Sequence, residues 1–292
     1  MIDVRALWLN RPVCSDSQQA KIWRRSMQFF KGRFAKRSHV AAQVPDGQRV
    51  YAIGDIHGEA MLLNRLLVNI HKDLKTRASK QVTLVLLGDL IDRGPDSAVI
   101  LRAMMAAEDM SVVVLKGNHE QALVHAYRGD DQALEFWMEY GGITTLRSFG
   151  INPDGLDYAS LRAAMRQRIE PAIIEWMDSR PLHFSIGGYF FTHAGVRPGV
   201  PLEEQVEDDL LWIREPFLNS QRDHGKVVVH GHTIIAAPVE LGGNSICIDT
   251  GGHEFGRLTA LGLEGEQQWV VDAAEADLPE SIPGYAGQGE AE

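Results

Sequence analysis

The sequence Arg49-Val-Tyr-Ala-Ile53 is followed directly by Gly54-Asp55-Ile56-His57-Gly58. The short apolar run predicts a buried strand, and Pro45-Asp46-Gly47 before it predicts a turn. Residues two apart in an extended segment point the same way, so Asp55 and His57 can approach one ion together. Taken alone, such a pair is more often an ordinary loop than a metal site. Its meaning therefore depends on the strands around it.

Helix and strand patterns alternate after this first strand. Apolar residues recur at helical spacing in 63–70 and 100–105, and continuous apolar runs occupy 82–87 and 112–115. This β-α-β-α-β order predicts parallel strands covered on both faces, with functional loops at the carboxyl ends of the strands. Later short apolar segments predict a second sheet, and they span 182–186, 189–192, 227–229, 245–248, 258–263 and 267–271.

The pattern divides the chain into a basic N-terminal extension (1–47), a catalytic domain (48–272) and an acidic tail (273–292). Residues 129–180 contain helix formers and no strong strand signal, which predicts a mainly helical insertion in the catalytic domain. The tail contains no Lys or Arg and has several acidic, Pro and Gly residues, a composition that predicts disorder.

Charge is distributed unevenly along the chain. Residues 1–39 carry nine Lys/Arg and two Asp, whereas the rest carries 20 Lys/Arg and 37 Asp/Glu, for a net charge of −10 overall. An acidic body argues against broad nucleic-acid binding, which requires clustered cations. Residues 19–37 mix bases with apolar residues, which is compatible with an amphipathic helix on an anionic membrane or partner, or with a helix packed on the body.

The sequence shows no long apolar run and no signal-peptide pattern at its start, so we expect a soluble, cytoplasmic protein. Cys14 and Cys247 are the only cysteines. Two distant cysteines provide neither a disulfide framework nor the paired thiolates of a zinc site. Any metal would therefore be bound by oxygen and imidazole ligands.

Four more polar clusters follow predicted strands. They are Gly88-Asp89-Leu90-Ile91-Asp92-Arg93-Gly94, Gly117-Asn118-His119-Glu120, His193-Ala194-Gly195 and His230-Gly231-His232-Thr233. Asp, Asn and His at five strand ends are hard to explain by packing. Carboxylate, amide oxygen and imidazole are ligands that divalent metals use. The five clusters together favour a site for two divalent ions.

In this order, GDIHG, GDLIDRG, GNHE, HAG and GHT resemble the bacterial serine/threonine phosphatases of the phosphoprotein phosphatase family, within the calcineurin-like metallophosphoesterases. The resemblance implies an α/β fold, a four-layer α/β/β/α sandwich with two mixed β-sheets. It also implies a set of metal ligands, with Asp89 shared between the two ions: Asp55, His57, Asp89, Asn118, His193 and His232.

The resemblance implies a phosphomonoester hydrolase in which a hydroxide bound to two metals attacks phosphorus in line, without a covalent intermediate. Manganese is the expected metal, with iron or zinc as alternatives. The substrate would be a phosphorylated protein or a small phosphoester. Arg93, Arg214 and Asn118 would contact the phosphate, since arginine suits phosphate oxygens, although either arginine could instead form a surface ion pair.

The family also implies a proton donor for the leaving group. His119, oriented by Asp92, would be that acid and would contact the substrate, because a carboxylate raises an imidazole's pKa and fixes its tautomer. The simpler alternative is that His119 only caps the following helix. One departure concerns the last rim loop, where related proteins often have a tyrosine and this chain has His253, Glu254 and Phe255.

Two rival functions are compatible with the same motifs. A diadenosine tetraphosphate hydrolase has the same metal ligands but typically lacks an aspartate at the position of Asp92, so Asp92 favours the phosphomonoesterase. A metal-binding scaffold with decayed activity, working through its basic N-terminal extension, is the rival from another class. The complete ligand set and the Asp92–His119 pair argue against decay.

Overall fold

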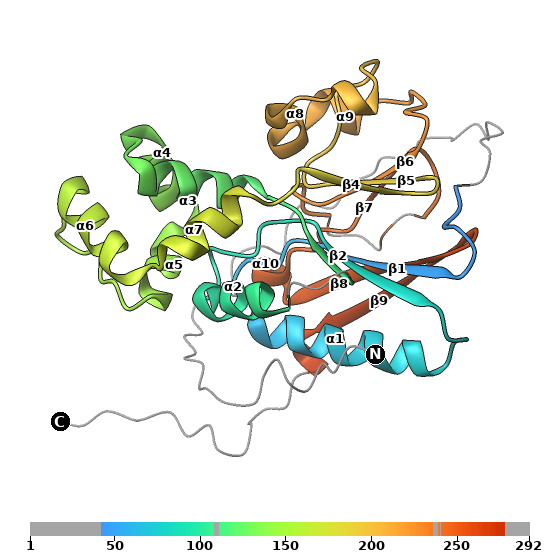
Figure 1. Ribbon diagram of the computed structural model, residues 1–292, viewed down its shortest axis with the longest axis horizontal. Helices are drawn as coiled ribbons and strands as arrows, with labels where there is room; N and C mark the ends of the chain where they lie inside the picture. The colour runs from blue at the N-terminus through green and yellow to red at the C-terminus, as the bar shows by residue number, and fades with distance from the viewer. Residues whose placement is uncertain (1–41, 108–110, 236–238, 240, 278–292) are drawn as a thin grey trace, which may run out of the picture.

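Two β-sheets packed face to face form the centre of the molecule in the computed structural model (Figure 1). The structure describes residues 42–107, 111–235, 239 and 241–277. The predicted amphipathic helix at 19–37 and most of the predicted acidic tail lie outside these residues. None of the helices in these ranges is long and apolar enough to span a membrane.

The first sheet has the order β3-β2-β1-β8-β9 and contains the predicted β-α-β-α-β unit. β1 (Gln48–Ile53), β2 (Gln81–Leu86) and β3 (Val112–Val114) are parallel. β8 (Arg257–Glu264) and β9 (Gln267–Ala274) extend the sheet in antiparallel orientation. The parallel strands direct their carboxyl ends to one edge, where the loops carrying Asp55, Asp89 and Asn118 begin.

The second sheet has the order β4-β5-β6-β7. β5 (Tyr189–Thr192), β6 (Val227–His230) and β7 (Ser245–Cys247) are parallel, and β4 (His183–Ile186) pairs antiparallel with β5. Both sheets are therefore mixed, as predicted.

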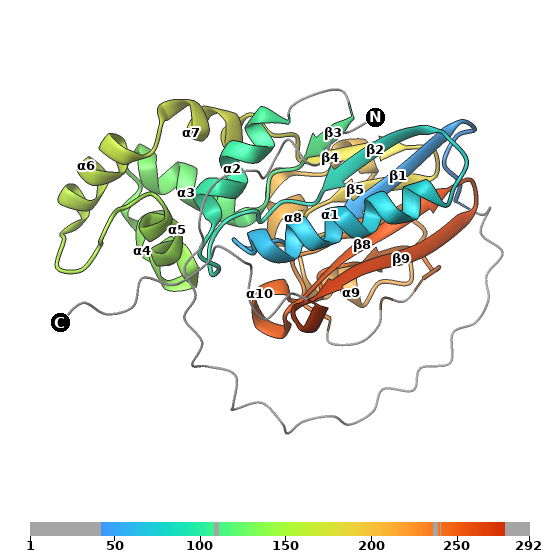
Figure 2. The ribbon, with the colours of Figure 1, turned by 90° about the horizontal axis from the view of Figure 1, so that it is seen from below.

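Alternation along β1 shows how the layers are separated. Tyr51 and Ile53 pack outward, while Val50 and Ala52 pack inward in the core between the two sheets. Figure 2 shows α1 (Ala60–Lys75) lying along the outer face of the first sheet.

Short helices cover the outer face of the second sheet. α8 (Glu207–Trp212) and α9 (Glu215–Leu218) contribute Leu210 and Phe217 to a cluster with Phe190 of β5. With α1 on the opposite side, this completes the four-layer sandwich, so the predicted fold class is confirmed.

Most of the remaining helices, those between residues 118 and 178, gather at one end of the sandwich in both views (Figures 1 and 2). The predicted insertion at 129–180 contains helices and loops and no strand. Ordered structure continues past the predicted start of the tail at 273, because β9 ends at Ala274 and a 3-10 turn, Glu275–Asp277, follows. The remaining helices are α2 (Ser97–Ala106), α3 (Asn118–Arg128), α4 (Asp131–Trp137), a π-turn (Met138–Gly142), α5 (Ile143–Ser148), α6 (Tyr158–Arg168), α7 (Pro171–Asp178), a 3-10 turn (Leu202–Glu204) and α10 (Gly252–Phe255).

Candidate metal centre and active site

The loops after the strands of both sheets are joined by backbone hydrogen bonds. The N–H groups of Ile56 and His57 both donate to the carbonyl of Asp89, at 3.0 and 2.8 Å. Across the other sheet, the N–H of Gly231 donates to the carbonyl of His193 at 2.8 Å. Side chains that are far apart in sequence are thereby held in one place.

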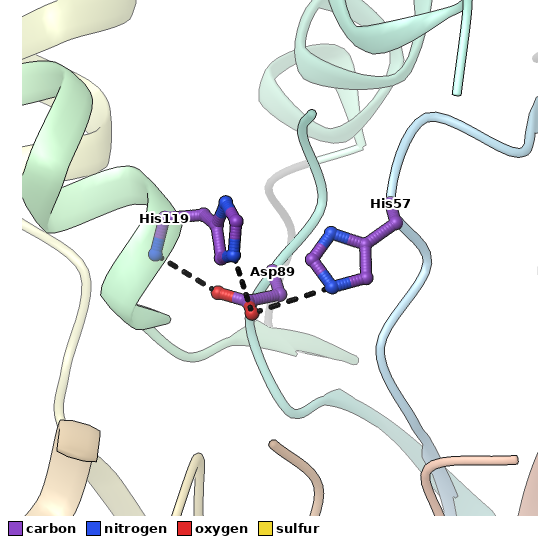
Figure 3. Close-up of side chains that lie close together, drawn as sticks. All are labelled: His57, Asp89 and His119. Atoms are coloured by element: carbon purple, nitrogen blue, oxygen red, sulfur yellow. Dashed lines mark hydrogen bonds and ion pairs between the residues drawn. The ribbon is translucent and has the colours of Figure 1, made fainter. Parts of the chain in front are cut away.

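Asp89 lies at the centre of the candidate metal site (Figure 3). Its Oδ2 is 3.6 Å from His57 Nε2 and 3.5 Å from His193 Nε2. His57 Nδ1 is 2.9 Å from the carbonyl of Ile91, and His193 Nδ1 is 2.9 Å from that of Leu87. Since a carbonyl only accepts, each Nδ1 carries the hydrogen, and each Nε2 turns a lone pair towards Asp89.

The other predicted ligands adjoin this centre. Asn118 Oδ1 is 2.7 Å from His193 Nε2 and 3.0 Å from His232 Nδ1, and Asp55 accepts the backbone N–H of His232 at 3.0 Å. Two groups have ligand atoms within 4.8 Å of one another, His57-Asp89-His119 and Asp89-His193-His232. Asp89 belongs to both, as expected for a residue shared by two ions.

The charges and donors in this cluster fit divalent cations. Burial, then the carboxylates of Asp249 and Asp89, raise the pKa of Asp55 well above its usual value. Burial lowers the pKa of His57, so its imidazole is neutral and able to act as a ligand. His232 Nε2 is buried and has no hydrogen-bond partner in the described part of the chain. A bound cation would relieve the repulsion among these buried carboxylates, and His193 Nε2 and His232 Nδ1 beside Asn118 Oδ1 are nitrogen atoms that could bind it.

Glycines allow the backbone to approach the carboxylates. A Cβ on Gly231 would overlap Asp55 Oδ1, and one on Gly117 would overlap Asp89 Oδ1. Backbone strain is also concentrated here, because positive φ angles of 46° to 73° occur at five non-glycine residues among those described. All five are predicted site residues: His57, Asp89, Asp92, Arg93 and His232.

The predicted proton donor, His119, lies beside the His/Asp cluster that could bind metal. His119 Nδ1 is 2.6 Å from Asp92 Oδ2, and His119 Nε2 lies 3.3 Å from Arg93 Nη2 and 3.8 Å from Asp89 Oδ2. Burial disfavours the charged imidazolium, but the Asp89 and Asp92 carboxylates outweigh burial and raise the pKa of His119. The imidazole therefore retains its proton better than free histidine does.

Arg214, the least specific of the predicted residues, also lies at the cluster. Its Nη2 donates to the carbonyl of His232 at 3.4 Å, and the side chain is exposed. The structure thus brings all ten predicted residues together. Arg214 differs from the others because it contacts the centre only through the carbonyl of His232.

Several residues that adjoin the site were not singled out by the sequence. Glu120 accepts the backbone N–H groups of Gly117, Asp89 and Leu90 at 2.8 to 2.9 Å, and so joins two loops that carry predicted ligands. Asp249 is buried beside Asp55. It follows the strand β7, and the strand-end pattern that identified the other clusters could have found it.

An arginine and a carboxylate-held imidazole beside two His/Asp clusters, in loops that follow strands of two mixed sheets, are the features of a metal-dependent phosphoesterase. The sequence profile of the calcineurin-like phosphoesterases matches residues 48–264, and the chain belongs to that family.

Similar proteins fall into two groups. Serine/threonine-protein phosphatase 1 of Salmonella typhimurium is 30% identical over 74% of this chain and 93% of its own length. Serine/threonine-protein phosphatase 2 of Escherichia coli is 28% identical over 73% and 91%. A symmetrical bis(5'-nucleosyl)-tetraphosphatase of Cellvibrio japonicus is 34% identical over 55% of this chain and 52% of its own length.

Among solved structures, a putative diadenosine tetraphosphatase has a TM-score of 0.56 and 23% identity, and covers 80% of this chain and 98% of its own. This likeness supports the fold.

Proposed function

We propose that the protein is a metal-dependent phosphomonoesterase that acts on phosphoserine or phosphothreonine in proteins. The observation that carries the proposal is the 2.6 Å contact between His119 Nδ1 and Asp92, with His119 Nε2 3.3 Å from Arg93. A serine or threonine alkoxide is a strong base and needs a proton to leave. A proton donor beside a phosphate-binding arginine is suited to that leaving group.

Each side chain then has a distinct task. Arg93 and Arg214 bind phosphoryl oxygens and stabilise the charge that develops on them. Asp92 accepts the Nδ1–H of His119 and favours its imidazolium form, in which the second proton, the one to be transferred, is at Nε2, on the side of Asp89 and Arg93. The neutral imidazoles and the carboxylates of the cluster hold two divalent ions, for which we propose Mn²⁺. When bound, such ions supply an activated water and polarise the phosphoryl group.

The lengths of the matches support the same choice. The chain covers more than nine tenths of the two protein phosphatases but about half of the tetraphosphatase. The second candidate, dinucleotide tetraphosphate hydrolysis, is favoured by the somewhat higher identity of that shorter match. A nucleotide phosphate is a weaker base than an alkoxide and depends less on a proton donor. Asp92 and His119 therefore favour the first candidate.

The deciding experiment compares a phosphothreonine peptide, p-nitrophenyl phosphate and diadenosine tetraphosphate as substrates of the purified protein with Mn²⁺. We expect release of phosphate from the peptide and from p-nitrophenyl phosphate. Preferential symmetrical cleavage of the dinucleotide would refute the proposal.

Asp89→Asn serves as the control because Asp89 belongs to both His/Asp groups. We expect it to abolish activity on every substrate. A wild-type protein that binds metal and hydrolyses none of the three would instead be a binding scaffold.

A further inference from the structure

Asp92 is surrounded by hydrogen-bond donors. The side chain is fully buried, and besides His119 it contacts two further side chains. The hydroxyl of Thr145 donates to Oδ1 at 2.6 Å, and the indole Nε1–H of Trp137 lies 3.0 Å from Oδ1 and 2.8 Å from Oδ2. Trp137 and Thr145 are also fully buried. Every donor to this carboxylate is thus shielded from water.

Both additional donors come from the helical insertion and not from the β-α-β frame that carries Asp92. Trp137 is the last residue of α4, and Thr145 lies in α5. The π-turn between these helices has non-helical dihedral angles at Tyr140 and Gly141, and the carbonyl of Gly141 accepts the backbone N–H of Arg93 at 3.2 Å. The insertion therefore contacts both Asp92 and its neighbour Arg93.

These contacts restrict how the carboxylate can turn. Asp92 and Arg93 have φ angles of 73° and 68°, a conformation that needs support from its surroundings. The hydroxyl of Thr145 supplies part of it by accepting the backbone N–H of Asp92 at 3.0 Å, as Ser97 Oγ also does. With Oδ1 and one side of Oδ2 occupied, Oδ2 presents its remaining lone pair to His119 Nδ1.

We propose that Trp137 and Thr145 are positioning residues for proton transfer: through Asp92, they hold His119 with Nε2 directed at the leaving group. The inference rests on the proposed function, because it takes His119 as the proton donor. It assigns to the insertion a role in substrate specificity. The insertion makes the enzyme competent for strongly basic alkoxide leaving groups, and it contributes little where the leaving group needs no proton.

The test compares Trp137→Phe and Thr145→Val with wild type on two substrates at saturating Mn²⁺. The phosphothreonine peptide releases a strongly basic alkoxide, whereas p-nitrophenyl phosphate releases a weakly basic phenolate. Misdirecting the proton donor should lower kcat for the peptide by roughly tenfold or more, with KM unchanged, and lower kcat for p-nitrophenyl phosphate by less than about threefold. Thr145→Ser keeps the hydroxyl and should restore the peptide activity.

Trp176→Phe is the matched control for the indole. Trp176 is buried in α7 of the same insertion, and its Nε1 has no hydrogen-bond partner within the described residues. This variant should retain wild-type kcat on both substrates. Thermal unfolding of each variant identifies any that fail to fold. If Trp137→Phe fails to fold, the comparison of Thr145→Val with Thr145→Ser decides alone.

The outcomes separate the two proposals. Equal losses of kcat on both substrates in Trp137→Phe and Thr145→Val, or losses confined to KM, would overturn the positioning role and leave the proposed function intact. His119→Asn is the reference, and it should reproduce the substrate-selective loss. If His119→Asn shows no selectivity, or if wild type does not cleave the peptide, the proposed function fails and the inference fails with it.

Discussion

Two strand-end loops place a buried aspartate beside the metal cluster, and they hold it in different ways. In the loop after β2, Asp92 is contacted by three side-chain donors. In the loop after β7, Asp249 Oδ1 accepts the N–H of Gly251 at 2.9 Å, while burial and the charge of Asp89 raise the Asp249 pKa to about 6. The first carboxylate is anchored by side-chain donors, and the second is under a repulsion that a cation would relieve.

The same contrast extends to the neighbours of these two aspartates. Arg93 is tied to the insertion through Gly141, whereas His253 Nδ1 is buried without a hydrogen-bond partner in the described structure, and Phe255 is 52% exposed. The difference teaches that contacts with the insertion fix the orientation of Asp92 and Arg93 in the β2 loop. The β7 loop instead places the negative charge of Asp249 beside Asp55 and leaves Phe255 exposed.

Among changes to these two aspartates and their neighbours, the largest effect should come from breaking the orientation of Asp92. Asp92→Asn replaces an acceptor-only carboxylate with a neutral amide, so His119 loses both its partner and its raised pKa. We expect kcat for a phosphothreonine peptide to fall about 10²- to 10³-fold, with metal content unchanged. Steady-state kinetics and elemental analysis provide the measurement. A kcat within threefold of wild type would show that Asp92 does not orient His119 for catalysis.

Metal removal tests the repulsion among the buried carboxylates. Without cations, the repulsion among buried carboxylates that raises the pKa of Asp55 and Asp249 persists, so chelation should lower the melting temperature. At a free metal concentration of 100 Kd, binding adds about 2.7 kcal/mol to stability, or several degrees. Scanning calorimetry with and without EDTA measures the shift. Identical melting curves would show that the cluster does not require cations.

A smaller change should loosen only the contact between the insertion and Arg93. Gly141 has a φ of 119°, and a Cβ there would lie 2.8 Å from Arg93 Cγ. Gly141→Ala should displace the guanidinium and raise KM about tenfold. Gly129→Ala is the matched control, since Gly129 has a φ of 121° with nothing within 4 Å of the added Cβ. It should cost about 1 kcal/mol of stability without changing KM. Similar kinetics for the two variants would argue against this role of Gly141.

The smallest effect is expected from Asp249→Asn, which removes a charge from the second loop. The metal-free protein should become more stable by about 1 kcal/mol, because Asp55 loses a repulsive neighbour. Metal affinity should fall about tenfold, and kcat at saturating Mn²⁺ should stay close to wild type. Thermal melts measure the stability of the metal-free variant, and metal titrations measure its affinity. A less stable metal-free variant would mean that Asp249 is held by hydrogen bonds, as Asp92 is.

Much of the fold could be predicted because the relevant signals are local. Apolar runs followed by Gly, Asp and His identified the strands and their loops, and parallel strands bring their carboxyl ends together by geometry. Asp249 was missed although it also follows a strand, because a single aspartate before a glycine is typical of ordinary turns. His253 could be noted as unusual, but its position against His57, with ring centroids 5.2 Å apart, could not be predicted.

The sequence by itself determined the fold class and the chemical types of the ligands, since strand patterns and strand-end residues are properties of short segments. Only the tertiary structure decided that Trp137 and Thr145 reach Asp92. They lie 45 and 53 residues away in an insertion where a tryptophan ordinarily indicates a packed core. Contacts across such separations depend on how helices pack, and no local pattern of residues records that packing.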